Sequence, residues 1–352
     1  MVRRGSGPES FRAACDRVDT RTVVFRPPPS NFSEVRPVPP SLSERSLIRF
    51  VLPGRRIRPR LPVPTRRTSV FRPLAPLAVV LLALALASPC ARADDGLFGV
   101  FTGPSGNPCR GPGSLLALLN RPTVSDSSCT VAPGRVMVEG GWQRLNLYEI
   151  PGGRSVNYPE FEFSFGLPDR TEIFVLPPNY NRQTVGLSPG ITSGGSSATT
   201  VGLRHMLVDN ELWQIAAEEV VTLPSGSSEY GSAGTGYATN AILSYSLPHG
   251  FGAELQLGVS SETLPTAAGG ERYTSFNPIG DLTYAWDNRY QFYGEIFGET
   301  ETAPGAGEGF AWDGGFQYLP LPHFELDVEI GHRISGTLGF DNYVGFGGGF
   351  EF

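Results

Sequence analysis

Asn342-Tyr-Val-Gly-Phe-Gly-Gly-Gly-Phe-Glu-Phe352 is the stretch that decides the fold of this chain of 352 residues. Its apolar side chains share one parity: Val344, Phe346, Phe350 and Phe352. Successive side chains of a β-strand point to opposite faces, so the pattern predicts a strand with one apolar face. Chain ends of soluble domains usually fray, whereas this chain stops within a strand on an aromatic residue. The stretch is typical of the closing strand of an outer-membrane β-barrel.

Three residues of this stretch also suggest how such a barrel would be assembled. Gly347, Phe350 and Phe352 resemble the C-terminal signal that the bacterial barrel-assembly machinery reads. That signal usually begins with a polar residue, where this chain has Gly345. We therefore expect two partners, the barrel-assembly machinery and the lipid of the outer membrane.

The amino-terminal part carries the features of an export signal. Arg66-Arg67 and Arg72 precede an apolar run from Leu74 to Ala87, and Ala91-Arg92-Ala93 follows. A basic region, a short apolar region and an A-x-A site make a secretory signal peptide, whereas a transmembrane helix needs about 20 apolar residues. We expect a signal peptide at 66–93, and a buried helix is the alternative.

The segment ahead of this signal has no counterpart in an ordinary exported protein. Residues 1–65 are rich in Arg and Pro and lack a periodic pattern, so we expect them to be disordered. A mis-assigned start codon is the simplest explanation for their presence. Both segments are therefore left out of the prediction of the fold.

The charge of the chain is divided unevenly. Residues 1–93 hold 17 of the 28 arginines but five of the 34 acids, and the chain contains no lysine. Residues 94–352 therefore have 11 arginines against 29 acids, a net charge of −18. Nucleic-acid binding requires a basic surface, so this balance argues against a nucleic-acid partner.

Cys109 and Cys129 are the two cysteines beyond the signal peptide. Two cysteines in an oxidising compartment most simply pair, and this bond would tie down a segment rich in Gly and Pro. A zinc site is not expected, because no His lies near and the spacing fits no zinc pattern. We predict a disulfide and no metal or other cofactor. Residues 94–133 would then form a plug inside the barrel or a periplasmic segment.

From residue 134 onward, apolar and polar residues alternate in twelve segments separated by turn residues. The alternation is clearest at 251–260, 310–318 and 324–331. The other segments are 135–149, 156–166, 171–178, 199–208, 211–222, 238–247, 275–286, 289–299 and 342–352. The pattern predicts an all-β fold, an antiparallel transmembrane β-barrel of about 12 strands over residues 134–352.

The connections between these segments alternate in length. Short turns, such as 167–170 and 247–250, alternate with longer loops such as 179–198 and 223–237. Outer-membrane barrels have short periplasmic turns and longer outer loops. The soluble alternative is a β-sandwich. Aromatic residues near the strand ends, which suit interfacial girdles, and an acidic, Gly- and Ser-rich polar parity favour the barrel.

Short motifs resemble a known family. Leu119-Asn-Arg-Pro-Thr-Val124, Cys129-Thr-Val131 and Pro133-Gly134 are similar to the start of the outer-membrane transporters of the meta-pathway of phenol degradation family. Leu176-Pro-Pro-Asn-Tyr180 resembles the same family. The resemblance covers residues 94–352 loosely, and it implies an outer-membrane transporter without naming its substrate.

An acidic lumen is the functional feature that the alternation predicts. The lumen-lining candidates on the inward parity are Glu139, Glu160, Glu162, Arg204, Glu254, Asp281, Glu295, Asp313, Glu325, Asp327 and Glu329. Acidic linings concentrate cations, and 11 arginines cannot pair with 29 acids, so some acids must be hydrated. We predict a channel for passive uptake of small solutes, with aromatic or hydrophobic compounds among the candidates. The alternative is a non-conducting structural or adhesive barrel.

Two further expectations concern charge at the membrane and catalysis. A lipid-facing Arg at mid-membrane costs about 2–4 kcal/mol, so Arg144 should face inward or lie at a rim. Outer-membrane phospholipases are also twelve-stranded and use a Ser/His pair, which His332 and Ser335 could supply. A triad needs a third, orienting group, and none is identifiable, so we expect no enzymatic activity.

Overall fold

The computed structural model describes residues 37–38, 49–50, 107–186 and 190–352. Within the first 65 residues these are β1 (Pro37–Val38) and β2 (Arg49–Phe50), which pair antiparallel. The predicted signal peptide at 66–93 lies outside the described residues. In the described part of the chain, no helix is long and apolar enough to cross a membrane.

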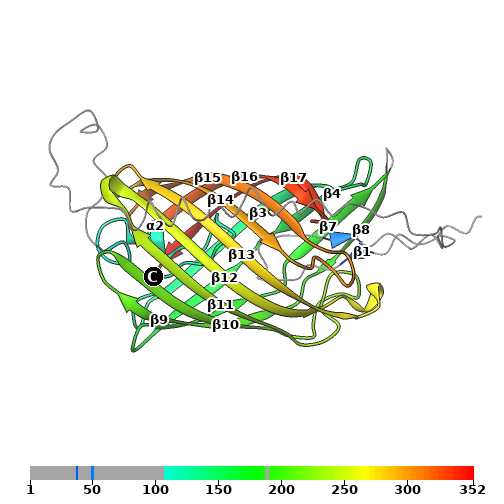
Figure 1. The fold of residues 1–352 in the computed structure, drawn as a ribbon, viewed down its shortest axis with the longest axis horizontal. Coiled ribbons are helices and arrows are strands. Elements are labelled where there is room, and N and C mark those ends of the chain that lie inside the picture. Colours follow the sequence, from blue (N-terminus) through cyan, green and yellow to red (C-terminus); the bar gives the residue numbers. More distant parts are fainter. Residues whose placement is uncertain (1–36, 39–48, 51–106, 187–189) are drawn as a thin grey trace, which may run out of the picture. The chain divides into compact units, whose positions relative to one another are not determined.

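Residues 136–351 form one antiparallel sheet that closes on itself (Figure 1). The closure is the pairing of the last strand, β17, with the first strand of the wall, β3. The wall consists of β3 (Val136–Leu147), β4 (Arg154–Tyr158), β5 (Glu162–Leu167), β6 (Thr171–Leu176), β7 (Tyr180–Val185), β8 (Ile191–Ser196), β9 (Thr200–Asp209), β10 (Trp213–Thr222), β11 (Gly236–Ser246), β12 (Phe251–Thr263), β13 (Arg272–Ala285), β14 (Tyr290–Glu299), β15 (Gly309–Leu321), β16 (Phe324–Gly336) and β17 (Phe340–Glu351).

These fifteen elements make twelve crossings of the wall, because three neighbouring strands are each interrupted once. β4 continues into β5, β6 into β7, and β8 into β9. Pro159 lies in the first interruption and Pro177-Pro178 in the second, where a proline cannot donate to the sheet. The interruptions are braced to one another, since the Glu160 backbone N–H donates to Asn179 Oδ1 at 2.6 Å. The predicted twelve-stranded closed barrel is confirmed.

The structure corrects one predicted connection. Residues 179–198 were expected to form a long outer loop, but β7 and β8 extend the wall as a hairpin. Hydrophobic alternation does not reveal these two strands, because the residues on both of their faces are mostly polar. Asn181 and Gln183 are buried towards the lumen, while Arg182 is exposed on the exterior. Hydrophobic alternation could not mark a strand with so few apolar side chains.

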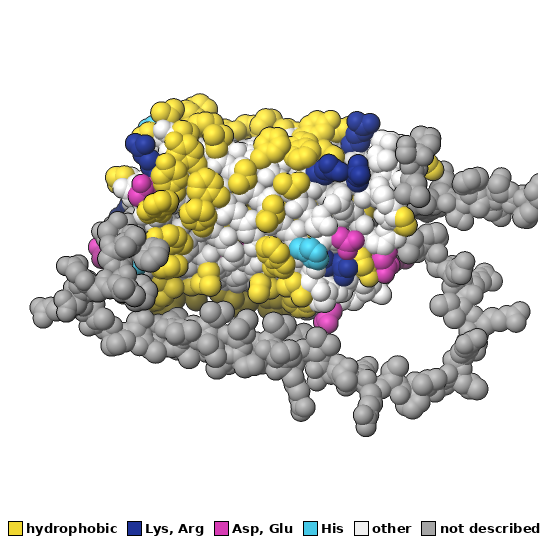
Figure 2. Space-filling model, turned by 90° about the horizontal axis from the view of Figure 1, so that it is seen from above, with side chains coloured by type: hydrophobic (Ala, Val, Ile, Leu, Met, Phe, Trp, Pro, Cys, Tyr) yellow, Lys and Arg dark blue, Asp and Glu magenta, His cyan; other side chains and the backbone are white. Residues whose placement is uncertain are grey.

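The distribution of burial is the reverse of that in a soluble domain. On β12, Leu255, Leu257 and Val259 are 42–52% exposed, whereas Gln256 and Ser260 are 4% and 1% exposed. Figure 2 shows that hydrophobic side chains cover a broad band of the exterior. A β-sandwich would bury this parity, so the exterior excludes the soluble alternative. Apolar side chains outside and polar ones inside are the arrangement of a barrel embedded in the bacterial outer membrane.

The two ends of the barrel differ as the sequence predicts. The short turns, including η1 (Pro248–Gly250), share the end at which the C-terminus lies, and we call it the periplasmic end (Figure 1). The longer connections, including 223–235 and 264–271, which contains η2 (Thr266–Ala268), lie at the outer end. Cross-strand aromatic pairs lie beside the short turns: Trp213–Tyr245, Phe251–Tyr284 and Tyr290–Tyr318, with centroids 4.4, 4.6 and 5.0 Å apart. They are placed as an interfacial girdle would be.

The terminal aromatic residue provides a test of barrel assembly. The Phe352 backbone N–H donates to the Val136 carbonyl at 2.8 Å, and its ring lies 4.6 Å from that of Phe350. Replacing Phe352→Ala keeps the backbone contact and removes the ring. If the ring is part of the assembly signal, less folded barrel will reach the outer membrane while export continues. Heat-modifiable migration on gels of membrane fractions measures this effect.

The matched control is Phe251→Ala, because Phe251 is also an exposed aromatic residue at the periplasmic end. Equal losses in the two variants would indicate a general effect of aromatic anchoring. Normal assembly of the Phe352 variant would leave the proposed signal without support.

Candidate functional site

Residues 107–135, which we call the plug, precede the wall and run inside it. The helix α2 (Ser114–Leu118) buries Leu115, Leu116 and Leu118. They pack in one cluster with wall residues Met137 and Met206, which are 0% and 2% exposed. Cys109 and Cys129 form the predicted disulfide, which spans this packed segment, with their Cα atoms 5.4 Å apart. The described residues 107–135 thus contact inward-facing side chains of the wall.

Carboxylates of the wall bind the backbone of the plug. Glu139 on β3 accepts hydrogen bonds from the backbone N–H groups of Asn120 and Arg121, at 3.1 and 2.7 Å. Glu295 on β14 accepts in the same way from Val124 and Ser125. The plug has no regular structure here, so its N–H groups need partners from elsewhere. Wall carboxylates supply the acceptors that a helix or sheet would otherwise provide.

Arg121 is the first of two buried ionic anchors of the plug. Its guanidinium lies 2.7 Å from Glu160, 3.2 Å from Asp327 and 3.6 Å from Glu329. Burial alone would lower the pKa of this group, but Asp327, Glu160 and Glu329 raise it well above its ordinary value. Arg121 therefore remains charged and joins the strand interruption at 159–161 to β16.

The space for Arg121 is made by two glycines of the wall. A Cβ atom added at Gly141 on β3 would lie 2.4 Å from the Arg121 guanidinium carbon. A Cβ atom at Gly347 on β17 would lie 2.4 Å from Arg121 Nε. Gly347 is also a residue of the expected assembly signal. The structure gives it a second role, because any larger residue there would displace the anchor.

The second anchor is Arg204 on β9, whose side chain is completely buried. It lies 2.7 Å from Glu218 on β10, 3.5 Å from Glu172 on β6 and 3.9 Å from Asp126 of the plug. Glu172 also accepts a hydrogen bond from the Val131 backbone N–H at 2.8 Å. Arg204 thus links the plug to three adjacent wall strands. A buried charge persists only when it is paired in this way.

Four acids, one of them Glu295, form a row across four neighbouring strands of the wall. Glu254, Asp281, Glu295 and Asp313 are direct cross-strand neighbours on β12, β13, β14 and β15, and we call them the acidic row. In the described part of the chain, no arginine lies within 4.0 Å of any of them, and Oδ1 of Asp281 and Oδ1 of Asp313 are buried without a hydrogen-bond partner. Such a row is costly to bury, because like charges directly opposite one another are destabilising.

An apolar layer lies between the charged part of the lumen and the outer loops. Leu145, Phe297 and Phe340 are at most 2% exposed and pack in one cluster with Ile279 and Tyr343. These side chains come from β3, β13, β14 and β17, which belong to one continuous run of neighbouring strands. On β14, Phe297 lies two residues further towards the outer end than Glu295 of the acidic row.

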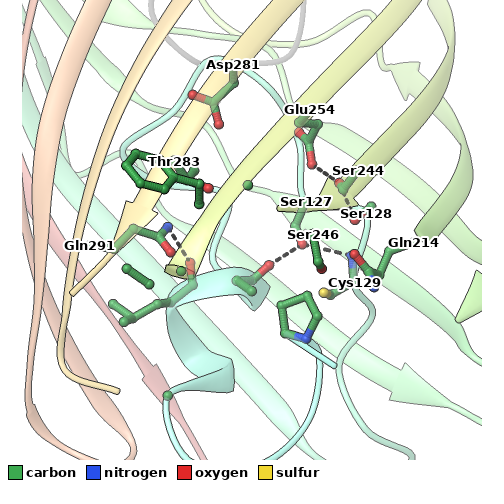
Figure 3. A pocket seen from close by; sticks show the side chains of 18 of the residues that line it. Ser127, Ser128, Cys129, Gln214, Ser244, Ser246, Glu254, Asp281, Thr283 and Gln291 are labelled. Carbon is green, nitrogen blue, oxygen red and sulfur yellow. Dashed lines mark hydrogen bonds between the residues drawn. The ribbon is translucent and has the colours of Figure 1, made fainter. Parts of the chain in front are cut away.

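A pocket of about 460 Å³ lies between the plug and the wall (Figure 3). Leu116 and Ser128 of the plug form one side, and residues of β10–β14 form the other. Glu254 and Asp281 of the acidic row line it together with Gln214 and Gln291. Glu254 accepts a hydrogen bond from Ser244, whose hydroxyl lies 2.7 Å from that of Ser128. The pocket therefore joins the acidic row to a polar surface beside α2.

The structure distributes the predicted lumen-lining residues over four places, all of them inside the wall. Glu139, Glu160, Glu162, Glu295, Asp327 and Glu329 contact the plug, Arg204 forms the second anchor, and Glu254, Asp281, Glu295 and Asp313 form the acidic row. Glu325 is fully buried on β16, and neither of its carboxylate oxygens has a hydrogen-bond partner among the described residues.

Several residues of the site were missed by the sequence analysis. Arg121 and Asp126 lie in an irregular segment, where no alternation indicates direction. Glu172 and Glu218 lie on strands. The adjacent pair Glu218-Glu219 could have signalled the inward acid, because neighbouring side chains of a strand point to opposite faces. The structure buries Glu218 and exposes Glu219.

The residues considered for catalysis lie on the surface of the barrel. His332 and Ser335 are both exposed, and His332 Nδ1 contacts the carbonyl oxygen of Arg333 at 2.6 Å. Among the residues that the structure describes, no cluster of His, Cys, Asp and Glu could hold a metal ion.

The first anchor can be tested through stability. Arg121→Gln removes one partner from a buried group of carboxylates, and such a change costs about 3–5 kcal/mol. We expect the free energy of unfolding in detergent, measured by denaturant titration, to fall by about that amount. The control is Arg289→Gln, because Arg289 is exposed beside a periplasmic turn of the wall. Even an exposed ion pair contributes only up to about 1 kcal/mol. Equal effects of the two substitutions would show that Arg121 is no special anchor.

Comparison with known proteins agrees with this architecture. An outer-membrane channel from Pseudomonas putida F1 matches with a TM-score of 0.53 at 10% identity, over 65% of this chain and 100% of that chain. The NanC porin matches with a TM-score of 0.41 at 13% identity, over 61% and 98%. The CymD monoaromatic hydrocarbon channel matches with a TM-score of 0.37 at 10% identity, over 72% and 98%. A search of curated proteins finds no match.

The family model described as MetA-pathway of phenol degradation matches residues 154–343, from the start of β4 into β17. This range is more than half of the chain and includes most of the wall. The motifs at 119–134 lie ahead of the match, and Leu176–Tyr180 lies within it. The chain therefore belongs to the MetA-pathway of phenol degradation family.

Proposed function

We propose that the protein is an outer-membrane channel for the passive uptake of small solutes. Family membership and the likeness to the Pseudomonas putida F1 channel support this function. The observation that carries it is the way in which the lumen is closed. The plug is held to the wall by polar contacts and by ion pairs, among them the buried anchors Arg121 and Arg204, and its disulfide lies within the plug itself. A path beside the plug can therefore open without disturbing the sheet.

The layers of the lumen suggest what would pass. The apolar layer around Phe297 and Phe340 favours solutes with an aromatic or hydrophobic part. The acidic row and the pocket then favour neutral or positively charged solutes over anions. The volume of the pocket lies within the usual range of small-molecule sites and is large enough for one small solute.

Conductance distinguishes a channel from a non-conducting structural or adhesive barrel. The purified protein inserted into planar bilayers should show discrete openings. Arg121→Gln should raise their frequency, because it releases the plug from β16, and Arg289→Gln, which lies outside the plug, should not. Silence of both the wild-type protein and the Arg121 variant would favour the non-conducting alternative.

The acidic row predicts the selectivity of that channel. Asp281→Asn removes one charge beside the pocket, so the ratio of cation to anion permeability should fall towards unity. The reversal potential under a salt gradient measures this ratio. Glu211→Gln removes the same charge at an exposed periplasmic turn and serves as the control. An unchanged ratio in the Asp281 variant would separate the acidic row from the conduction path.

We propose no catalytic role. The solved structures that match include channels, porins and an autotransporter domain. A phospholipid hydrolysis assay with Ser335→Ala as control tests the remaining enzymatic option. Hydrolysis that depends on Ser335 would contradict this part of the proposal.

A further inference from the structure

Three arginines face away from the lumen near the outer end of the barrel. Arg144 on β3 is partly exposed, and Arg154 on β4 and Arg182 on β7 are exposed. No hydrogen bond or ion pair of these three guanidinium groups occurs within the part of the chain that the structure describes. The side chains next to them along the strands are buried towards the lumen: Gln143, Leu145, Ser155, Asn157, Asn181 and Gln183.

The register of the strands brings the three arginines onto one patch. Val156 on β4 pairs with Arg144 on one side and with Arg182 on the other. Strands lie about 4.8 Å apart, so the Cα atoms of Arg144 and Arg182 are separated by roughly 10 Å. Arg154 lies two residues from Val156, about 6.6 Å further towards the loops on the same face. Long arginine side chains from these positions can reach a common ligand.

Neighbouring exterior positions show the depth of this patch in the membrane. Arg144, Val156 and Arg182 share one row of exterior positions. The next row towards the bilayer centre holds Trp142 on β3, Tyr158 on β4 and Tyr180 on β7. The Tyr158 and Tyr180 rings are 5.3 Å apart, and both are more than 40% exposed. Aromatic belts of this kind lie at the level of the lipid headgroups. The arginines are therefore at or just beyond the headgroup region of the outer leaflet.

The residues around Arg154 support the same depth. In its row the exterior positions are polar, with Asn146 on one side and Thr184 on the other. Asn146 donates a hydrogen bond to Asn342 at 2.6 Å, which continues the polar row onto β17. None of these positions carries an acid that could neutralise the arginines.

The row below is equally free of acids. Val344 on β17 pairs with Arg144, and Gly194 on β8 pairs with Arg182. Neither residue offers a polar side chain to a guanidinium group. The positive charge of the patch is therefore left for a ligand from outside the sheet.

This patch departs from the rest of the described chain, in which acids outnumber arginines. An arginine that faces lipid near the interface is tolerated by a barrel, but it gains nothing from lipid tails. Guanidinium groups bind phosphate oxygens through paired, charge-assisted hydrogen bonds. Figure 2 shows basic side chains gathered near one end of the hydrophobic exterior.

We propose that Arg144, Arg154 and Arg182 form a binding site for the phosphate groups of an outer-leaflet lipid. The apolar and aromatic surface below them would contact the acyl chains of the same molecule. The phosphates would neutralise the three guanidinium groups at the depth where the aromatic belt places them. The site lies on β3, β4 and β7, and two of these belong to the interrupted strands. Lipid binding there does not depend on a solute in the lumen.

The test uses the folded protein in detergent and native mass spectrometry. The probes are bisphosphorylated lipid A and the same lipid without phosphate. The triple variant Arg144→Gln/Arg154→Gln/Arg182→Gln should bind the bisphosphorylated form on the order of 100-fold more weakly than the wild-type protein, since each arginine near a charged lipid surface contributes about a factor of five. The single variant Arg154→Gln should lose about that factor of five if the triple variant does not fold.

The matched control removes arginines from the opposite rim. Arg170 and Arg289 are exposed beside periplasmic turns, so Arg170→Gln/Arg289→Gln lowers the basic charge without altering the patch. It should bind as the wild-type protein does. Any of three results would overturn the proposal. The wild-type protein could bind both forms of the lipid equally well. The triple and single variants could keep full binding, or the control could lose as much binding as they do.

Discussion

Closure of the sheet is the constraint on which the rest of this structure depends. In a bilayer every backbone N–H and C=O group must find a partner within the protein, and an open sheet edge leaves a row of them unpaired. The pairing of β17 with β3 removes that edge. It also requires the exterior to be apolar and the interior to hold the polar parity of every strand. The inward position of the strand acids and the outward position of the exterior patch both follow from this single arrangement.

The sequence was sufficient for the wall because the wall obeys a short period. Alternation marked β12, β15 and β16 without ambiguity, and short turns indicated the number of crossings and the two ends. Alternation failed at β7 and β8, where the inward Asn181 and Gln183 alternate with Arg182 and Thr184. Polar residues on both faces carry no signal of parity. The orientation of these strands is determined by the pairing of β7 with β4 and β8, and not by a local sequence preference.

The candidate site was predictable only in part, for a related reason. Parity placed the acids of the strands inside, but it could not say what each would meet there. Arg121 and Asp126 belong to a segment without a period, so their contacts depend on how the plug enters the closed wall. Arg121 meets carboxylates that are far away along the chain, such as Asp327 at a separation of 206 residues. Contacts of that range come from topology, which a local pattern does not contain.

The arrangement of charge indicates where a path through the barrel would run. Two arginines cannot neutralise the lumen, so several carboxylates accept hydrogen bonds from the plug backbone instead. The ionic anchors lie towards β16 and towards β6, β9 and β10. The acidic row on β12–β15 lacks such an anchor among the described residues, and the pocket opens next to it. Because no ionic anchor is described on that side, a small displacement there would widen the existing pocket while both anchors stayed in place. The path is therefore expected beside the acidic row, between the plug and β11–β14.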